Sequence, residues 1–449
     1  MSSKQRGSFG SRFGAIAAAT GSAVGLGNIW RYPYVVGENG GAAFICIYLL
    51  VVFLIGVPIL MCEFAIGRNT NKNVFGAFDL LAPGKKWYLI GVLGIAASFV
   101  ILSFYSVVAG WTMAFLQGSI TNTFDGFSVA AISAKFDGFV ASGWEPILWC
   151  ALFIIITAAI VVLGVEKGIE KYNKILMPML FVIILILCIN SITLDGFKEG
   201  MNFLFKPDFS KITPNVALNA LGQAFFSLSL GMGTMMTYGS YLRKKDNLLF
   251  TSATVAISDI TIAVMAGIAI FPAVFSFGIE PGSGPDLVFK TLPNIFQQMT
   301  GGYFFSILFF LLLFVAALTS SVSILEVLVA YFTEEMKMSR LKSAILSSAG
   351  VLVASILCAL SQMPDSPLKV AGMNLFDLFD VGSSSYMLPI GGFFIVIYTG
   401  WIFSKKYLKT ELASDGLYKV VYYPVFLFII KFVAPIAIAM IFLSKIGLI

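Results

Sequence analysis

The amino-acid sequence predicts an all-α polytopic membrane protein with 11 transmembrane helices. Composition is the first reason: 58% of the 449 residues are hydrophobic and 12% are charged, whereas a soluble domain carries about 25% charged residues. The second reason is that apolar runs of membrane-spanning length, ~20 residues, recur along the whole chain. A chain this poor in charge cannot cover a water-facing surface, which excludes a soluble enzyme, a disordered protein and a nucleic-acid-binding protein.

The apolar runs are separated by polar or Gly- and Pro-containing connections, none of which is long enough for a soluble domain. We number the expected helices 1 to 11 in chain order. They cover residues 11–37, 42–67, 88–118, 145–164, 169–191, 214–240, 249–277, 302–335, 340–361, 375–403 and 417–445.

The basic residues predict the orientation in the membrane. With the N-terminus inside, 20 of the 29 Lys and Arg residues fall on inside segments and 7 on outside segments, while Arg31 and Lys431 lie within helices. Cytoplasmic loops are enriched in Lys and Arg. We therefore expect a multi-pass protein of the cell (inner) membrane with a cytoplasmic N-terminus and an extracellular C-terminus.

The first ten helices divide into two sets of five. The first set occupies residues 11–191 and the second 214–403, joined by an extracellular connection at 192–213. Because five is odd, the second set starts on the opposite membrane face, so any repeat between the sets is inverted. Residues 1–10 then form a cytoplasmic N-terminal segment, and residues 404–449 form a cytoplasmic loop and helix 11.

Two counts argue against an enzyme. The chain has no histidine, which is the commonest metal ligand and the usual base near neutral pH. Its cysteines stand singly in apolar runs without a C-x-x-C pair, as expected for small buried side chains. They are Cys46, Cys62, Cys150, Cys188 and Cys358.

Helices 1 and 6 carry glycines in the middle of the span, where each costs about 1 kcal/mol relative to Ala. These are Gly21, Gly25 and Gly27 in helix 1, and Gly231 and Gly233 in helix 6. One interpretation is close packing between helices. The glycines occupy matching positions in the first helix of each five-helix set. This match favours a second interpretation, in which both helices are interrupted and their free backbone groups bind a solute and ions near the midplane.

Five sequence motifs resemble the neurotransmitter:sodium symporter family, and its bacterial amino-acid transporters in particular. They are GSAVGLGNIWRYP (21–33), ENGGAAF (38–44), CEFAIGR (62–68), FFSLSLGMG (225–233) and ALTSS (317–321). The similarity runs from Arg6 to about Trp401. It implies a LeuT-like fold of two inverted five-helix repeats with helices 1 and 6 interrupted, and the count of 11 spans also resembles the bacterial branch.

The resemblance implies two sodium ions. The residues of the first site are Ala23, Asn28, Ser227 and Asp259, completed by a substrate carboxylate; many relatives have Asn where Asp259 stands. Those of the second site are Gly21, Val24, Ala316, Thr319 and Ser320. Thr319 and Ser320 share one face of helix 8 with Ala316, and oxygen-only ligation suits a small hard cation. The alternative for these two hydroxyls is bonding to their own helix backbone.

The resemblance also implies a substrate pocket on helices 1, 3, 6 and 8. Its residues are Ser22, Ala23, Gly25, Leu26, Gly27, Ile101, Tyr105, Phe226, Ser227, Ser229, Met232, Ser320 and Ile324. Monoamine-carrying relatives have Asp at the position of Gly25, so here the substrate must bring its own carboxylate. Because the pocket for the side chain is apolar, we expect a neutral hydrophobic or aromatic L-amino acid.

Gates are implied at both ends of the pathway. Arg31 with Asp380 resembles the outer pair, and Arg6 with Glu334 and Tyr241 the inner one; a static ion pair and a solvated basic tail are the respective alternatives. The stretch from Gly168 to Pro178 at the start of helix 5 could unwind to admit water, or be an ordinary helix start.

Other intramembrane acids leave questions open. Ala263 stands where chloride-dependent relatives have Ser and chloride-independent ones often have a carboxylate. We expect chloride independence, with Glu63 or Asp259 supplying the fixed negative charge. Glu326 is either proton-linked or a buried hydrogen-bonded acid.

The expected function is sodium-coupled symport by alternating access, in which helices 1, 2, 6 and 7 move against the rest. A non-transporting amino-acid sensor on the same fold is the alternative. The expected partners are a small-molecule amino acid, sodium ions and the lipid bilayer, with no nucleic acid.

Overall fold

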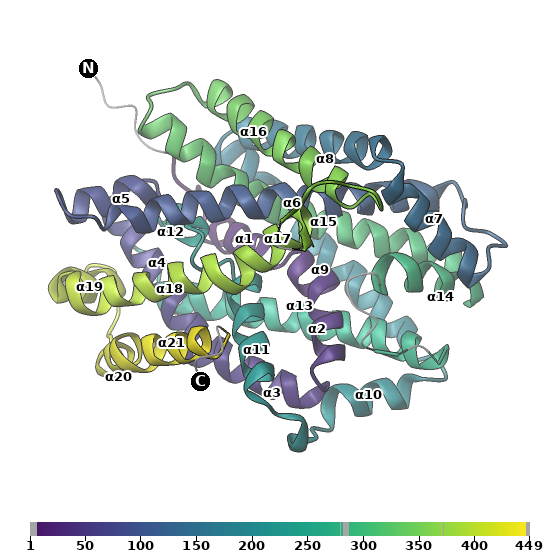
Figure 1. Cartoon of the computed structure of the whole chain (residues 1–449). Coiled ribbons are helices and arrows are strands. Elements are labelled where there is room, and N and C mark those ends of the chain that lie inside the picture. Colours follow the sequence, from purple (N-terminus) through teal and green to yellow (C-terminus); the bar gives the residue numbers. More distant parts are fainter. Residues whose placement is uncertain (1–6, 279, 282–286, 371, 446–449) are drawn as a thin grey trace.

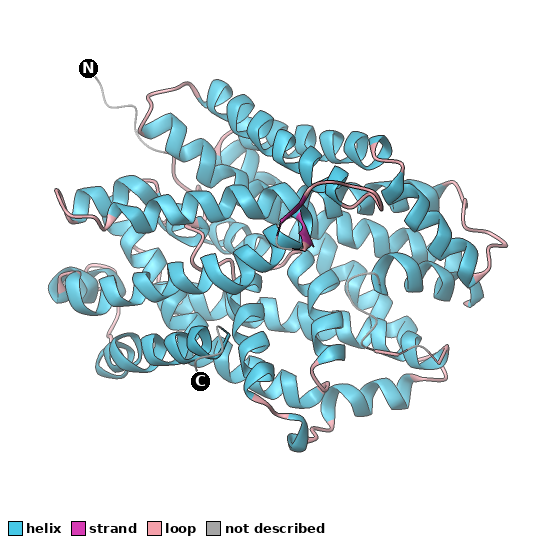
Figure 2. Ribbon diagram, in the orientation of Figure 1, coloured by secondary structure: helices cyan, strands magenta, loops and turns pink. Residues whose placement is uncertain are grey.

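The computed structural model describes residues 7–278, 280–281, 287–370 and 372–445, and nearly all of them are helical (Figures 1 and 2). The long helices run side by side, with short helices at their ends. The strands in the described chain are a short antiparallel pair, β1 (Lys369–Val370) and β2 (Met373–Asn374).

The first half of the chain holds the expected helices 1 to 5 and short helices in their connections. Its segments are α1 (Arg12–Ala23), η1 (Gly27–Arg31), α2 (Tyr32–Glu38), α3 (Ala42–Val51), η2 (Val52–Gly56), α4 (Val57–Thr70), α5 (Val74–Leu81), α6 (Tyr88–Ile120), α7 (Val129–Ala141), α8 (Trp144–Val162), η3 (Val165–Glu170), α9 (Lys171–Ser191) and α10 (Phe197–Phe205).

The second half holds helices 6 to 11. Its segments are η4 (Phe209–Lys211), α11 (Pro214–Ser227), α12 (Thr234–Gly239), α13 (Leu248–Ser276), η5 (Leu287–Thr291), α14 (Leu292–Gln298), α15 (Gly302–Glu334), α16 (Arg340–Ser361), α17 (Leu375–Gly382), η6 (Ser383–Met387), α18 (Leu388–Ile397), η7 (Tyr398–Ile402), α19 (Lys405–Leu412), α20 (Tyr423–Phe428), η8 (Ile429–Val433) and α21 (Ala434–Lys445). The η segments are π-helical except η4, which is a 3₁₀ turn.

Nine helices in the described chain are long and apolar enough to cross a membrane, and they match the expected helices 2 to 5 and 7 to 11. Helices 1 and 6 are broken into shorter pieces, α1–η1–α2 and α11–α12. The total of 11 spanning helices stays a prediction. Helix 11 begins at Tyr423 rather than at 417, because positive φ values at Ser414, Asp415 and Gly416 make a turn before it.

The broken helices lie inside the molecule rather than on its surface. The two 33-residue helices α6 and α15 pack along one another. Helix α1 contacts α9, α13 and α15 (Figure 1). Most of α1 is buried, although it is built largely of Ala and Gly. Small residues let the neighbouring backbones come close, which is the usual way that membrane helices pack.

Helices α4 and α12 touch backbone to backbone. A side chain at Gly67 of α4 would meet the Met236 carbonyl of α12. In return, a side chain at Gly239 would meet the Phe64 backbone at 2.8 Å. Two glycines therefore allow an approach that no other residue permits at either position.

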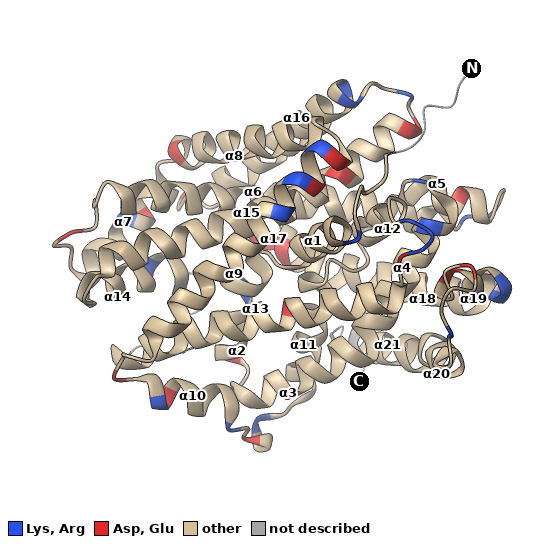
Figure 3. Ribbon diagram, turned by 180° about the vertical axis from the view of Figure 1, so that it is seen from behind, with Lys and Arg blue, Asp and Glu red and all other residues tan. Residues whose placement is uncertain are grey.

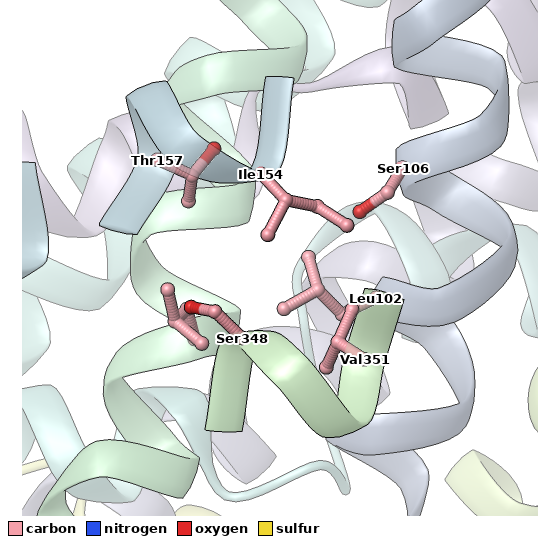
Figure 4. A pocket seen from close by; sticks show the side chains of 7 residues that line it. Leu102, Ser106, Ile154, Thr157, Ser348 and Val351 are labelled. Carbon is pink, nitrogen blue, oxygen red and sulfur yellow. The ribbon is translucent and has the colours of Figure 1, made fainter. Parts of the chain in front are cut away.

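The packing among α6, α8 and α16 is tight. Figure 4 shows side chains of these helices, including Leu102, Ile154 and Val351, around a small space that leaves no room for a water molecule. The hydroxyls of Ser106 and Ser348 at this space have no hydrogen-bond partner among the described residues. These helices form a close-packed region beside the broken ones.

Basic residues gather at one end of the molecule, where α5 and α19 lie and where α1, α6, α13 and α16 begin (Figure 3). We call it the basic end. Its Lys and Arg residues include Arg68, Lys85, Lys86, Arg243, Lys244, Arg340, Lys342, Lys405 and Lys406.

A buried ion cluster lies at the basic end. Arg68 Nε is 2.8 Å from Glu411 Oε2, and Lys244 pairs with the same carboxylate. The Arg68 guanidinium also donates to the Asp246 carbonyl at 2.6 Å. This Arg68–Glu411 cluster (Arg68, Lys244, Asp246 and Glu411) joins α4, the turn between α12 and α13, and α19.

Candidate functional site

Helix 1 opens after Ala23, as predicted. Val24 has an extended backbone with ψ of 101°, and the chain becomes helical again as the π turn η1. The Ser320 hydroxyl on α15 lies 3.3 Å from the Gly21 carbonyl and 3.4 Å from the Val24 carbonyl. The break therefore turns backbone oxygens of helix 1 toward helix α15.

Helix 6 opens over residues 228–233, where three residues have positive φ: Ser229 at 54°, Gly231 at 80° and Gly233 at 81°. The freed N–H of Gly231 donates to the buried Glu63 carboxylate at 2.8 Å. The Glu63 carboxyl group therefore lies at the break itself.

The residues of the first predicted sodium site meet between η1, α11 and α13. Asn28 Nδ2 donates to Asp259 Oδ1 at 2.7 Å, and the Ser227 hydroxyl donates to the same oxygen at 2.5 Å. The Tyr48 hydroxyl donates to the other carboxylate oxygen at 2.8 Å. Ala23 is the buried last residue of α1. This is a buried, oxygen-rich set that includes a carboxyl group, the chemistry that a hard cation prefers.

The residues of the second predicted site also come together. Thr319 Oγ1 lies 3.4 Å from the Val24 carbonyl and 3.0 Å from the Ala316 carbonyl. Ser320 Oγ approaches the Gly21 carbonyl as described. Thr319 Oγ1 is also 3.2 Å from the Val315 carbonyl, and because Val315 and Ala316 both precede Thr319 on α15, the alternative of bonding to the helix backbone occurs as well.

One small cavity contains most of the predicted substrate residues. It is lined by Ser22, Ala23, Gly25, Gly27, Ile101, Tyr105, Phe226, Ser229, Met232, Ser320 and Ile324. Its volume is about 10 Å³, room for about one water molecule. The two other predicted residues lie behind this wall: the Leu26 N–H donates to the Tyr105 hydroxyl at 2.9 Å, and Ser227 faces Asp259.

Gly25 decides how much space this cavity has. A Cβ atom at Gly25 would lie 2.7 Å from the Tyr105 hydroxyl and would also overlap the Ser320 hydroxyl. An acidic side chain therefore has no room at this position.

Ser323 also contacts a residue of the cavity wall, although it was not among the predicted site residues. Its hydroxyl donates to Ser22 Oγ at 2.7 Å, and Ser22 Oγ is 3.5 Å from Ser229 Oγ. Ser323 lies three residues after Ser320, so the helical period placed it on the same face. Gln223 was missed as well; it donates to the Gly27 carbonyl at 2.7 Å, and a lone Gln in an apolar helix gave no sign of its target.

The predicted outer gate is a loose contact. Arg31 and Asp380 are 4.0 Å apart, and Arg31 donates to the Ser384 hydroxyl at 3.1 Å. The guanidinium stands 4.7 Å above the Phe226 ring, the residue that also lines the cavity. A second cavity of about 230 Å³ adjoins Arg31 and Asp380 on the far side.

At the basic end, Tyr241, a residue of the predicted inner gate, bonds to a buried acid. Its hydroxyl donates to Glu326 at 2.7 Å, and Arg340 pairs with Glu326 at 2.6 Å. Glu334, the acid of the predicted inner gate, accepts from the Asn73 N–H at 2.9 Å. Arg6 lies outside the described residues. Glu326 is thus a buried hydrogen-bonded acid, one of the two interpretations of the sequence.

The start of helix 5 is irregular where Gly168 lies, in the π-helical η3. A side chain at Gly168 would meet the Ile160 carbonyl, and Pro178 lies inside α9. Glu170 accepts from the Gly10 N–H at 2.6 Å and the Ser11 hydroxyl at 2.8 Å. The chain before α1 is therefore bonded to the start of helix 5.

Among the described residues, no group of three His, Cys, Asp or Glu side chains is placed to hold a metal. Ala263, at the position discussed for chloride, is buried on α13. The cavity that contains most of the predicted substrate residues lies at the two broken helices.

Broken helices of this kind, buried among apolar spans, define an integral-membrane secondary transporter. The chain belongs to the Sodium:neurotransmitter symporter family, whose sequence profile matches residues 6–128 and 127–448. It has the fold of the family's bacterial members: the crystal structure of MhsT in complex with L-phenylalanine aligns with a TM-score of 0.92 and 46% identity, covering 98% of this chain and 100% of MhsT.

Curated sodium-dependent transporters are similar to this chain over most or all of its length. An uncharacterised sodium-dependent transporter of Bacillus subtilis is 37% identical, with 100% of this chain and 99% of the relative covered. One of Haemophilus influenzae is also 37% identical, with 98% of each chain covered. A sodium- and chloride-dependent taurine transporter of Bos taurus is 26% identical, with 89% of this chain and 72% of the relative covered. The protein is therefore a sodium-dependent transporter rather than an enzyme.

Proposed function

We propose that this protein is a sodium-coupled symporter that imports a neutral hydrophobic or aromatic L-amino acid. The enclosed cavity at the two helix breaks carries the proposal. Its wall of Ile101, Phe226, Met232 and Ile324 suits an apolar side chain. The Tyr105 hydroxyl accepts from the Leu26 N–H, so its own proton is available to a substrate carboxylate.

The absence of an acidic side chain at Gly25 supports an amino acid over an amine, because the substrate must supply the carboxylate. MhsT, which shares the fold and 46% of the residues, is described as a complex with L-phenylalanine. The adaptable Met232 side chain is compatible with more than one substrate shape.

Two sodium ions accompany the substrate in this proposal. Asn28, Ser227 and Asp259, with the Ala23 carbonyl and the substrate carboxylate, hold the first. Thr319, Ser320 and the carbonyls of Gly21, Val24 and Ala316 hold the second. Because the substrate carboxylate completes the first site, binding of each favours the other.

Transport proceeds by alternating access, with the N-terminus in the cytoplasm. The Arg31–Asp380 pair with Phe226 and Tyr105 closes the outer path, while Arg6, Glu334 and Tyr241 close the inner path. The Gly168–Pro178 stretch then opens to release sodium. A membrane potential of 100 mV contributes about 2.3 kcal/mol for each charge moved inward.

The test is uptake of each standard amino acid into proteoliposomes with and without an inward sodium gradient. Sodium-driven accumulation of hydrophobic or aromatic L-amino acids is expected. Accumulation that does not depend on sodium would contradict symport. Sodium-dependent binding without counterflow would instead support a non-transporting sensor.

Replacing Ser320 by Ala should raise the sodium concentration for half-maximal substrate binding several-fold, because one oxygen of the second site is lost. Ser103→Ala is the matched control, since the Ser103 hydroxyl donates to the Phe99 carbonyl of its own helix at 2.7 Å. Equal sodium dependence in both variants, measured by scintillation proximity binding, would refute the assignment of Ser320.

A further inference from the structure

A groove on the membrane-facing surface at the basic end has no role in the proposed transport cycle. It lies between α6, α15 and α16 and has a volume of about 490 Å³, within the range of about 300–1,000 Å³ usual for ligand sites. Val92, Ile95 and Phe99 line it from α6, Leu328 and Phe332 from α15, and Leu346 from α16.

The groove opens toward lipid near the ends of its helices. Val92 is 44% exposed and Leu346 is 47% exposed, whereas Leu328 at the bottom is buried. At 1.5 Å per residue, Val92 and Leu346 lie within about 10 Å of the starts of α6 and α16. An acyl chain from the adjacent leaflet reaches this depth directly below its head group.

Three lysines flank the mouth of the groove. Lys342 lies four residues before Leu346 and eight before Gly350, on the same face of α16. Lys85 and Lys86 directly precede α6. All three are exposed, and none of their ammonium groups forms an ion pair with a described residue.

Other charged residues near the groove form hydrogen bonds or ion pairs of their own. Arg340 pairs with Glu326, and Lys337 donates to the Glu334 carbonyl at 2.7 Å. Glu334 and Glu335 accept hydrogen bonds from Asn73, at the start of α5. The basic side chains Arg340 and Lys337 are therefore bonded elsewhere, whereas Lys85, Lys86 and Lys342 form no ion pair with a described residue.

One polar atom lies inside the apolar groove. Ser347 lines it, is 3% exposed, and its hydroxyl has no hydrogen-bond partner among the described residues. It lies five residues after Lys342, about 7.5 Å along the helix. An ester carbonyl of a diacyl lipid, which sits between the phosphate and the acyl chains, would give this donor an acceptor.

We propose that this groove binds an anionic diacyl phospholipid. An acyl chain fills the space between α6, α15 and α16, an ester carbonyl accepts from Ser347, and the phosphate lies among Lys85, Lys86 and Lys342. Such a site holds a lipid against the close-packed region rather than against the broken helices. The proposal goes beyond the transport function and does not depend on it.

The experiment uses the purified full chain in liposomes with a trace of phosphatidylglycerol or phosphatidylcholine carrying a photoreactive acyl chain. Cross-links are mapped by mass spectrometry. Phosphatidylglycerol should label peptides of α6 and α16 at the groove several-fold more than phosphatidylcholine. Equal labelling by the two lipids would overturn the head-group assignment, and labelling of the groove peptides by neither lipid would overturn the site.

Variants separate the acyl chain from the head group. A Cβ atom at Gly350 would meet only the Phe99 ring at 3.5 Å, so Gly350→Leu fills the groove without striking backbone. It should abolish labelling by both lipids, whereas Gly138→Leu on α7, where space is open, should not. Replacing Lys85, Lys86 and Lys342 by Gln should reduce phosphatidylglycerol labelling to the phosphatidylcholine level, and replacing Lys405, Lys406 and Lys409 should leave it unchanged. Unchanged labelling in Gly350→Leu would refute the site.

Discussion

Asp259 is the residue at which the polar contacts of the first candidate site converge. Asn28, Ser227 and Tyr48 all donate to its carboxylate, and all four residues are buried. A buried carboxylate of this kind is stable only when donors or a cation surround it. We therefore interpret the three donors as holding the carboxylate in place for sodium.

Replacing Asp259 by Asn keeps the shape but removes the charge and one acceptor. The sodium concentration for half-maximal binding should rise at least tenfold, because a unit charge a few ångströms from a cation is worth about 4 kcal/mol at an effective dielectric of 20. Sodium titration of amino-acid binding measures it. Asp195→Asn, on an exposed connection, is the control, and unchanged sodium affinity in Asp259→Asn would contradict the role.

For single residues, the sequence predicted site positions where those residues lie in specific motifs. Asn28, Ser227 and Thr319 were predicted because they stand in runs shared with the family. The Arg340–Glu326 pair was not predicted, since Arg340 begins a new helix after a turn and the sequence does not show where that turn brings its side chain. A pair formed across such a turn depends on the packing of α15 and α16.

Among the helices, the break in helix 6 depends on backbone conformation that glycine supplies. Gly231 has φ of 80°, and its N–H is the donor to Glu63. A Cβ atom there would overlap the Leu388 carbonyl of α18 and lie 3.1 Å from the Gly392 nitrogen. At Gly231, a side chain would therefore meet both a strained backbone conformation and a close contact with α18.

Gly231→Ala should lower the unfolding free energy by more than the roughly 1–3 kcal/mol that positive φ costs a residue with a side chain, because backbone atoms of α18 must also move. Gly126→Ala is the control: its φ is 72°, but no atom lies within 4 Å of the added Cβ. Thermal unfolding in detergent compares them. Equal losses in the two variants would show that the contact with α18 contributes nothing.

The mid-span glycines predicted both breaks, because glycine lowers helix stability and is expected there only where the backbone has to open or pack closely. The π-helical turns were not predicted. A π turn adds one residue to a helix and leaves its apolar composition unchanged, so hydropathy carries no sign of it. The predicted start of helix 11 was wrong for a related reason. The turn with positive φ at Ser414–Gly416 depends on backbone conformation, which hydropathy does not reveal.

The two ends of the molecule differ in how tightly their side chains are held together. Beside Arg31 and Asp380 lies a cavity of about 230 Å³, and that pair is 4.0 Å apart. The basic end is held by the Arg68–Glu411 cluster and by the Glu326–Arg340 pair at 2.6 Å. The gathering of basic residues at one end followed from the sequence, whereas the contacts among α4, α15, α16 and α19 that hold this end together did not.

Glu411 gives the basic end a defined pH dependence. Burial raises the pKa of Glu411, but hydrogen bonds from Lys244 and Arg68 outweigh it, so the pKa lies below its ordinary value. A carboxylate with a lowered pKa stabilises the fold above its unfolded-state pKa, about 4.3, and loses that contribution as pH falls through the folded-state pKa.

Glu411→Gln should therefore unfold at a lower temperature than the wild type at pH 7, with a gap that narrows below about pH 4.3. Unfolding temperatures in detergent across this range measure the gap. Glu199→Gln, on exposed α10, should show almost none. A gap that widens as the pH falls would have the wrong sign for a carboxylate held by cations.

The direct contact of α4 with α12 has a mechanical consequence. No side chain stands between Gly67 and Met236 or between Gly239 and Phe64, so changes of rotamer cannot absorb a displacement at this contact. A shift of the short helix after the break must carry α4 with it as a rigid unit. Arg68 near the end of α4 is bonded to Glu411 on α19, so a displacement that begins at the break in helix 6 would be transmitted to this distant ion pair.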